Sequence, residues 1–176
     1  MVSIREARFP HDAMAIRGID TSFSTDVVYD VETADHSISL KPRRLASPLR
    51  KRFPLDDLDD PERPWSHAFV ADAEGTCLGF AAAGFGPWNR RLTLWHLYVD
   101  PPARGQGVGR ALTERVLGLG RDLGARHLWL ETSNLNAPGV AVYEALGFQL
   151  TGIDLTLYVG TPAEGEIALF FSRPVV

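Results

Sequence analysis

A glycine-rich run between a strand-like and a helix-like segment constrains this chain more than any other dozen residues. Residues 91–99 have the composition of a strand, and the helix-like segment at 108–123 carries one apolar stripe of Val108, Leu112, Val116, Leu119 and Leu123. Between them, Gly105, Gly107 and Gly109 fall where a helix N-terminus presents unpaired N–H groups and the positive end of its dipole. Glycine also lets the backbone approach a ligand closely. The run therefore predicts a phosphate-binding loop at the start of a helix.

Three phosphate-binding patterns compete for this loop. A P-loop requires Lys followed by Ser or Thr after its last glycine, whereas Gly109 is followed by Arg110 and Ala111. The dinucleotide pattern G-x-G-x-x-G needs its third glycine one position later than Gly109, although Glu131 lies near where its ribose-binding acid is expected. An R-x-x-G-x-G pattern fits at every fixed position from Arg104 to Gly109. A strand–helix turn whose glycines serve only close packing is the structural alternative.

The composition disfavours several classes of protein. The formal net charge is −4, which argues against nucleic-acid binding by bulk electrostatics. Cys77 is the only cysteine and the 5 histidines lack ligand spacing, so we expect neither an intrachain disulfide nor a metal site. No apolar run reaches the length of a membrane span, and residues 1–10 lack the apolar centre of a signal peptide. We therefore expect a cytoplasmic protein with neither nucleic-acid nor membrane partners.

The order of predicted elements is that of one mixed α/β domain over residues 1–176. Strands are expected at 2–8, 27–31, 37–40, 67–72, 78–85, 91–99, 127–131, 148–158 and 166–171, and helices at 10–20, 108–123 and 137–146. Residues 21–64 are the least regular part of the chain. Within them, a basic run and an acidic run at 41–62 predict a solvated loop.

A second group of residues, C-terminal to the glycine loop, identifies a family. Glu131 ends a short apolar strand, Asn136 follows five residues later, and Tyr143 precedes a Leu-Gly-Phe sequence. Together with the R-x-x-G-x-G loop, this set resembles the GNAT superfamily of acyl-CoA N-acyltransferases. The resemblance implies a central twisted mixed β-sheet flanked by helices, with splayed fourth and fifth strands. It also implies an acetyl-CoA-binding core at 67–158 and a variable acceptor-side region at 21–64.

The same resemblance implies acetyl-CoA as co-substrate and no metal. The pyrophosphate is expected on the glycine loop, the pantetheine arm on Asn136, and the thioester carbonyl on a backbone N–H at the end of the fourth strand. The expected acetyl-CoA-binding residues are Leu97, Tyr98, Val99, Arg104, Gly105, Gln106, Gly107, Val108, Gly109, Arg110, Asn136 and Tyr143. Asn136 is also placed to cap the helix expected at 137–146.

Two catalytic roles follow from the resemblance and from the chemistry of amine acetylation. An alkylamine of pKa ~10 must lose a proton before it attacks a thioester, and a carboxylate can accept that proton. In related ribosomal-protein acetyltransferases this base matches Glu131, while a family tyrosine that donates a proton to the leaving thiolate matches Tyr143. His96, on the strand that lines the acceptor cleft in the family, is the rival base. The implied mechanism is direct transfer in a ternary complex.

A closer resemblance concerns the acceptor. Residues 20–25, 88–93, 128–148 and 152–158 are similar to the streptothricin acetyltransferases, which acetylate an amino group of a cationic antibiotic. That group carries acids in its fourth strand, whereas residues 94–98 read Leu-Trp-His-Leu-Tyr, which predicts a more apolar, aromatic cleft. Acids including Glu32 could attract a cationic acceptor there. The candidate acceptor-binding residues are Tyr29, Asp30, Trp88, His96 and Asp154.

Other functions stay open beside this one. Acetylation of a protein N-terminus, as in ribosomal-protein acetyltransferases, is one alternative. A non-catalytic acetyl-CoA-binding regulatory module is another, which the presence of both Glu131 and Tyr143 disfavours. The expected partner is a small-molecule amine, and many members of the family form homodimers.

Overall fold

The computed structural model describes residues 2–176, and they form two compact units. The first unit contains the chain up to Thr21, then Arg52–Trp129 and Pro174–Val176. The second contains Ser22–Lys51 and Leu130–Arg173. Strand β7 (His127–Ser133) begins in the first unit and ends in the second. The predicted division into a single domain with a variable region at 21–64 and a core at 67–158 stays a prediction.

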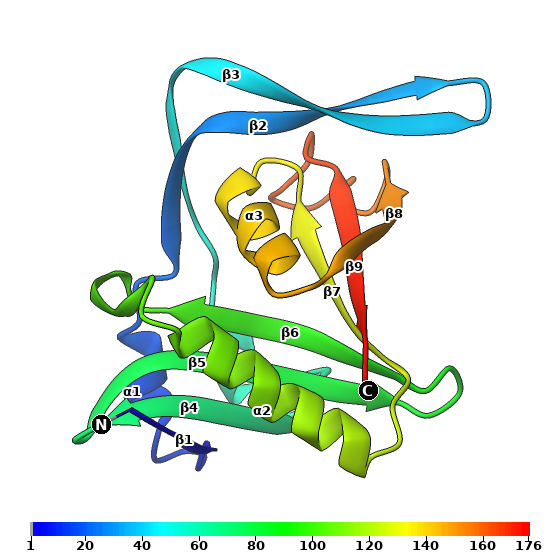
Figure 1. The fold of residues 1–176 in the computed structure, drawn as a ribbon. Helices are drawn as coiled ribbons and strands as arrows, with labels where there is room; N and C mark the ends of the chain where they lie inside the picture. The colour runs from blue at the N-terminus through cyan, green and yellow to red at the C-terminus, as the bar shows by residue number, and fades with distance from the viewer. Residues whose placement is uncertain (1) are drawn as a thin grey trace. The chain divides into compact units, whose positions relative to one another are not determined.

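A mixed sheet forms the first unit (Figure 1). Its strands are β1 (Ser3–Glu6), β4 (His67–Ala73), β5 (Thr76–Gly86), β6 (Arg91–Val99) and the start of β7, side by side in that order. The first three pairs are antiparallel, and β6 runs parallel to β7. The predicted strands at 67–72, 78–85 and 91–99 are therefore confirmed.

Helix α2 (Val108–Asp122) packs on β4, β5 and β6 of the same unit (Figure 1). Its apolar stripe makes that contact, because Val108, Leu112 and Val116 are all buried. The short helix α1 (Ala13–Arg17) and the 3₁₀ turns η1 (Asp56–Asp59) and η2 (Pro101–Ala103) complete the unit. A core gathers between these turns and the sheet, from Ile16, Ile19, Leu58, Trp65, Val70, Phe80 and Ala82.

Strands β6 and β7 pair only at their beginnings. The register runs from Arg91 opposite His127 to Thr93 opposite Trp129, whereas β6 continues to Val99. On its other side β6 stays paired with β5 as far as Val99 opposite Gly79. The parallel register of β6 with β7 therefore covers three residue pairs, and the predicted splay of these two strands stays a prediction.

The second unit holds the end of β7 beside β9 (Ala168–Pro174) and then β8 (Gln149–Asp154), with β8 antiparallel to β9. Helix α3 (Ala137–Ala145) contacts β2. Strand β8 ends four residues before the predicted end at 158, because residues 155–165 form bends and turns.

The prediction of an irregular, solvated loop at 41–62 is wrong for most of its length. Strands β2 (Ser22–Ala34) and β3 (Ser37–Arg52) form a long two-stranded ribbon, and residues 56–59 form the turn η1 (Figure 1). Basic residues of β3 form ion pairs with acidic residues of β2, which the sequence pattern did not predict. The ion pairs across the ribbon are Lys41–Glu32, Arg43–Asp30 and Arg44–Asp26.

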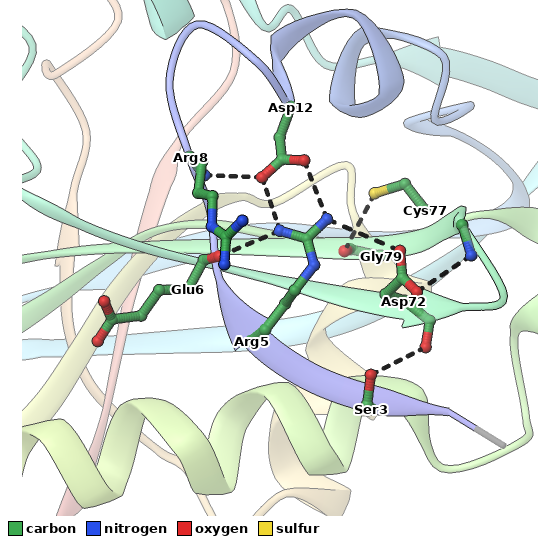
Figure 2. A network of polar contacts seen from close by, with 9 residues as sticks. Ser3, Arg5, Glu6, Arg8, Asp12, Asp72, Cys77 and Gly79 are labelled. Carbon is green, nitrogen blue, oxygen red and sulfur yellow. Dashed lines mark hydrogen bonds and ion pairs between the residues drawn. The ribbon is translucent and has the colours of Figure 1, made fainter.

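The N-terminal segment of the first unit is held by a buried carboxylate (Figure 2). Two guanidinium nitrogens of Arg5, on β1, donate to the two carboxylate oxygens of Asp12 at 2.7 and 2.9 Å. The backbone N–H of Arg8 donates to the same carboxylate at 2.7 Å. These hydrogen bonds lower the pKa of Asp12 to about 2, with that from Arg5 as the largest cause and burial opposing them.

None of the helices within residues 2–176 is long and apolar enough to cross a membrane. The same residues contain no group of His, Cys, Asp and Glu side chains that could hold a metal ion.

Candidate active site

The glycine loop of the first unit has an open, left-handed backbone. Gly105 has φ of 74° and Gly107 has φ of 84°, a region that L side chains rarely adopt. A Cβ atom added at either glycine would meet no other atom within 4 Å. Gly107 is the N-cap of α2, and no side chain caps this helix end. Residues 104–107 are exposed, so the N-terminus of α2 offers its backbone N–H groups to an external anion.

Two side chains fix the shape of this loop. The guanidinium of Arg104 donates to the carbonyl oxygen of Val99 at 2.8 Å and to that of Asp20 at 2.9 Å. The side-chain amide of Gln106 donates to the carbonyl oxygen of Pro102 at 2.7 Å. Arg104 therefore links the loop to neighbouring backbone and places a positive charge beside it. An exposed helix N-terminus beside a guanidinium is an arrangement that favours anions.

His96 is paired with a carboxylate that sequence reasoning did not single out. Its Nε2 lies 2.8 Å from Oδ2 of Asp57, which also accepts a hydrogen bond from Trp65 Nε1 at 2.6 Å. Burial opposes ionisation of Asp57, but the hydrogen bonds with His96 and Trp65 outweigh it and lower the pKa of Asp57. Nδ1 of His96 is buried and has no hydrogen-bond partner among the described residues. The ring lies among Trp65, Phe80 and Tyr98. His96 is thus held as part of an aromatic cluster.

Glu131 occupies β7 in the second unit, with its side chain partly buried. The hydroxyl group of Tyr158 donates a hydrogen bond to its Oε1. Burial raises the pKa of Glu131, while the hydrogen bond from Tyr158 and the charge of Lys51 act against that rise. The result is a desolvated carboxylate with increased proton affinity, which is a property of general bases.

An ion pair stands near this carboxylate. The ammonium group of Lys51, at the end of β3, contacts both carboxylate oxygens of Glu166. Both side chains are mostly buried, with 23% of Lys51 and 13% of Glu166 exposed. The charge of Lys51 lowers the pKa of Glu131 and the charge of Glu166 raises it.

Tyr143 on α3 keeps its proton at neutral pH. Burial raises the pKa of its hydroxyl to about 12, the charge of Glu131 acts in the same direction, and a hydrogen bond with Thr132 opposes both. The ring packs near Phe148 and Phe171. A tyrosine held in this way can only donate a proton near pH 7.

Asn136 caps α3, as predicted. Its Oδ1 accepts a hydrogen bond from the backbone N–H of Gly139 at 3.0 Å, and its amide nitrogen donates to the hydroxyl oxygen of Thr132 at 3.0 Å. Thr132 therefore joins the cap to Tyr143. Cap and tyrosine belong to one small network at the start of α3.

The candidate acceptor-binding residues lie in different surroundings. Tyr29 on β2 is tied through its backbone to Asn134, and Asp30 pairs with Arg43 at 2.7 Å. Asp154 accepts hydrogen bonds from the backbone and the hydroxyl of Thr156 in a turn, which lower its pKa. Trp88 is 88% exposed in the turn that joins β5 to β6, at the end of β6 opposite to the glycine loop.

Several residues that surround the candidate site residues were not predicted from the sequence, because they lie far along the chain from the groups that they contact. Tyr158 is 27 residues from Glu131, Glu166 is 115 from Lys51, and Asp57 is 39 from His96. Only Tyr158 carried any signal, since it ends the last segment that resembles the streptothricin acetyltransferases.

Comparison with known proteins identifies the family. The model of the Acetyltransferase (GNAT) family matches residues 28–148. This chain belongs to that family. The predicted GNAT membership, mixed α/β fold and N-acetyltransferase activity are confirmed, and acetyl-CoA is the co-substrate of this GNAT enzyme.

Relatives match this GNAT enzyme over most of its length. A streptothricin acetyltransferase of Streptomyces lavendulae is 42% identical over 177 residues, which cover 97% of this chain and 93% of that protein. The crystal structure of a nourseothricin acetyltransferase superimposes with a TM-score of 0.89 at 41% identity and covers 99% of both chains. A structure from Bacillus anthracis in complex with acetyl coenzyme A has a TM-score of 0.81 over 99% of both chains and, at 21% identity, shows the same fold.

A relative that acts on a protein matches less of the chain. The [ribosomal protein bS18]-alanine N-acetyltransferase of Escherichia coli K12 is 37% identical over 83 residues, or 47% of this chain and 55% of that enzyme. The likeness to the streptothricin acetyltransferase is therefore the more extensive one.

Proposed function

We propose that this enzyme acetylates an amino group of a streptothricin-type cationic antibiotic, with Glu131 as general base and Tyr143 as general acid. The observation that carries the proposal is that one unit holds both a desolvated carboxylate, bonded by a hydroxyl group, and a buried phenol. Glu131 is a carboxylate of raised pKa with a single bonded hydroxyl, and Tyr143 is a phenol held protonated by burial. One is suited to accept a proton near neutral pH and the other to donate one.

The two groups act at opposite ends of the transfer. Glu131, directly or through a water molecule, accepts the proton of the acceptor ammonium, so that the neutral amine attacks the thioester carbonyl. The C–N bond forms, the C–S bond breaks, and Tyr143 delivers its proton to the departing thiolate, whose ordinary pKa resembles the ~8.5 of a cysteine thiol. Transfer is direct, and the acetyl group never bonds to the protein.

Acetyl-CoA is held by the glycine loop and the adjoining strand in this proposal. The N–H groups at the start of α2 and the positive charges of Arg104 and Arg110 serve its pyrophosphate. Backbone groups of residues 97–99 serve the pantetheine arm and the thioester carbonyl, and Asn136 serves the arm as well. The open space around Gly105 and Gly107 and their left-handed backbone support this assignment.

The acceptor assignment rests on the length of the likeness. The streptothricin acetyltransferase of Streptomyces lavendulae aligns over 97% of this chain, including segments outside the family's cofactor motifs. Asp30, Asp154, Tyr29, Trp88 and His96 stay candidate acceptor-binding residues. We place the reaction in the cytoplasm and expect a homodimer, which light scattering after size-exclusion chromatography would test.

The test is release of free CoA thiol from acetyl-CoA in the presence of streptothricin. The wild-type enzyme should turn over, whereas Glu131→Gln should lower kcat/KM by about 10²- to 10⁴-fold, the usual contribution of a general base. Glu144→Gln, at an exposed acid on α3, is the matched control and should behave as wild type. An enzyme that binds acetyl-CoA but leaves streptothricin unacetylated would refute the acceptor. Full activity of Glu131→Gln would refute the base.

A further inference from the structure

The carboxylate of Glu131 has a hydrogen-bond donor that lies outside residues 28–148, the part of the chain that the family model matches. Tyr158 lies after β8 and is partly buried, and its hydroxyl group donates to Oε1 of Glu131. Burial raises the pKa of Tyr158, and the hydrogen bond and negative charge of Glu131 raise it further. Tyr158 therefore stays protonated near neutral pH and remains a hydrogen-bond donor.

The backbone around Tyr158 is built to keep the ring in place. Its carbonyl oxygen accepts hydrogen bonds from the backbone N–H of Thr161 at 3.0 Å and from the hydroxyl of Thr161 at 2.7 Å. One turn earlier, the backbone N–H of Val159 donates to the carbonyl oxygen of Thr156. Consecutive turns thus anchor the residue on both sides, although the segment has no helix or strand of its own.

We propose that Tyr158 is a positioning residue that holds Glu131 for proton transfer, and that the Lys51–Glu166 ion pair balances the charge around that carboxylate. The proposal rests on the assignment of Glu131 as general base and extends it to three groups with no assigned role. All of them belong to the second unit. They come from β3, from the turns after β8 and from the segment just before β9.

The groups that face Glu131 act on its proton in opposite directions. Tyr158 donates to the ionised carboxylate and favours it, as does the positive charge of Lys51, whereas burial and the charge of Glu166 disfavour it. From α3, Tyr143 faces Glu131 as a neutral phenol. With Tyr158 and Lys51 in place, a buried carboxylate can stay ionised and ready to accept a proton at neutral pH.

The pH dependence of kcat/KM separates this role from a merely structural one. Its acid limb reports ionisation of the base in the free enzyme. Tyr158→Phe keeps the ring and removes the donor, so the acid limb should move up by about one pH unit, as expected for loss of one hydrogen bond to a charged group. Below that limb kcat/KM should fall about tenfold, while the affinity for acetyl-CoA stays unchanged.

Variants of the ion pair test the same balance without touching Tyr158. Lys51→Met should move the acid limb to higher pH, because Glu166 is left unopposed, and Glu166→Gln should move it to lower pH. The chain offers matched controls in Lys41→Met, at the exposed lysine of the same strand, and Glu164→Gln, at an exposed acid two residues from Glu166. Neither control should move the limb.

The outcomes distinguish this inference from the proposed function. Superimposable pH profiles for wild type and Tyr158→Phe, in a system where Glu131→Gln is inactive, would overturn the positioning role and leave the base in place. Shifts of the same sign in Lys51→Met and Glu166→Gln would overturn the charge balance, even if Tyr158→Phe failed to fold. An active Glu131→Gln variant would instead remove the proposed base itself.

Discussion

Replacing Asp12 by Asn should destabilise the protein by an amount that depends on pH. The substitution keeps the shape of the side chain and removes the charge that accepts from Arg5 and from the backbone of Arg8 (Figure 2). Only 9% of the Asp12 side chain is exposed, so solvent screens these hydrogen bonds weakly. We therefore expect a measurable loss of stability from one side chain.

The magnitude follows from the pKa of Asp12, which is lowered from 3.8 to about 2. A difference of about 1.8 between unfolded and folded pKa values corresponds to about 2.5 kcal/mol of unfolding free energy, at about 1.4 kcal/mol for each unit. Because the folded pKa is the lower one, this stability is fully present well above pH 3.8. It is lost as the pH falls from 3.8 towards 2.

Urea unfolding at several pH values measures the effect. At pH 7, Asp12→Asn should lower the unfolding free energy by about 2.5 kcal/mol and the Tm by about 5–10 °C. At pH 3 the difference from wild type should shrink to about 1 kcal/mol. Asp59→Asn, which breaks the exposed ion pair with Arg17, is the control and should change stability by less than about 1 kcal/mol. A difference between Asp12→Asn and wild type that is independent of pH would refute the assigned cause.

Two further predictions concern the first unit. Gly107→Ala should weaken acetyl-CoA binding in calorimetry, because φ of 84° strains any L residue by about 1–2 kcal/mol. The control Gly118→Ala, within α2, should leave binding unchanged. Equal affinities of the two variants for acetyl-CoA would contradict the role of the loop. Asp57→Asn should cost about 1–3 kcal/mol of stability, because it weakens the hydrogen bonds with Trp65 and His96, yet leave the acid limb of kcat/KM in place. A displaced limb in Asp57→Asn would point to His96 as the base.

Local features of the site could be predicted because they depend on neighbours in the sequence. The left-handed backbone at Gly105 and Gly107 needs glycine, and a helix that starts directly after them presents its N–H groups there. Asn136 caps α3 through Gly139, three residues later, which is a relation of fixed spacing. The strands from β4 to β6 followed from their own runs of apolar residues.

The ribbon of β2 and β3 shows where such reasoning failed. Its strands carry charged residues on exposed faces, so the alternation of apolar and polar residues that predicts a strand is weak in this segment. From the sequence, the acids of β2 and the bases of β3 are separate charged runs. In the hairpin they lie opposite one another and form ion pairs. Pairing across a hairpin depends on register, which charge runs do not reveal.

By itself, the sequence indicated the acetyl donor, because the R-x-x-G-x-G loop and the set of Glu131, Asn136 and Tyr143 resemble the GNAT family and can be recognised from residues close together in the chain. Only the tertiary structure decided what surrounds Glu131. Tyr158, Lys51 and Glu166 reach its neighbourhood from three separate segments, and each changes its proton affinity. Electrostatic interactions act through space, so the state of a buried carboxylate depends on which distant residues folding brings beside it.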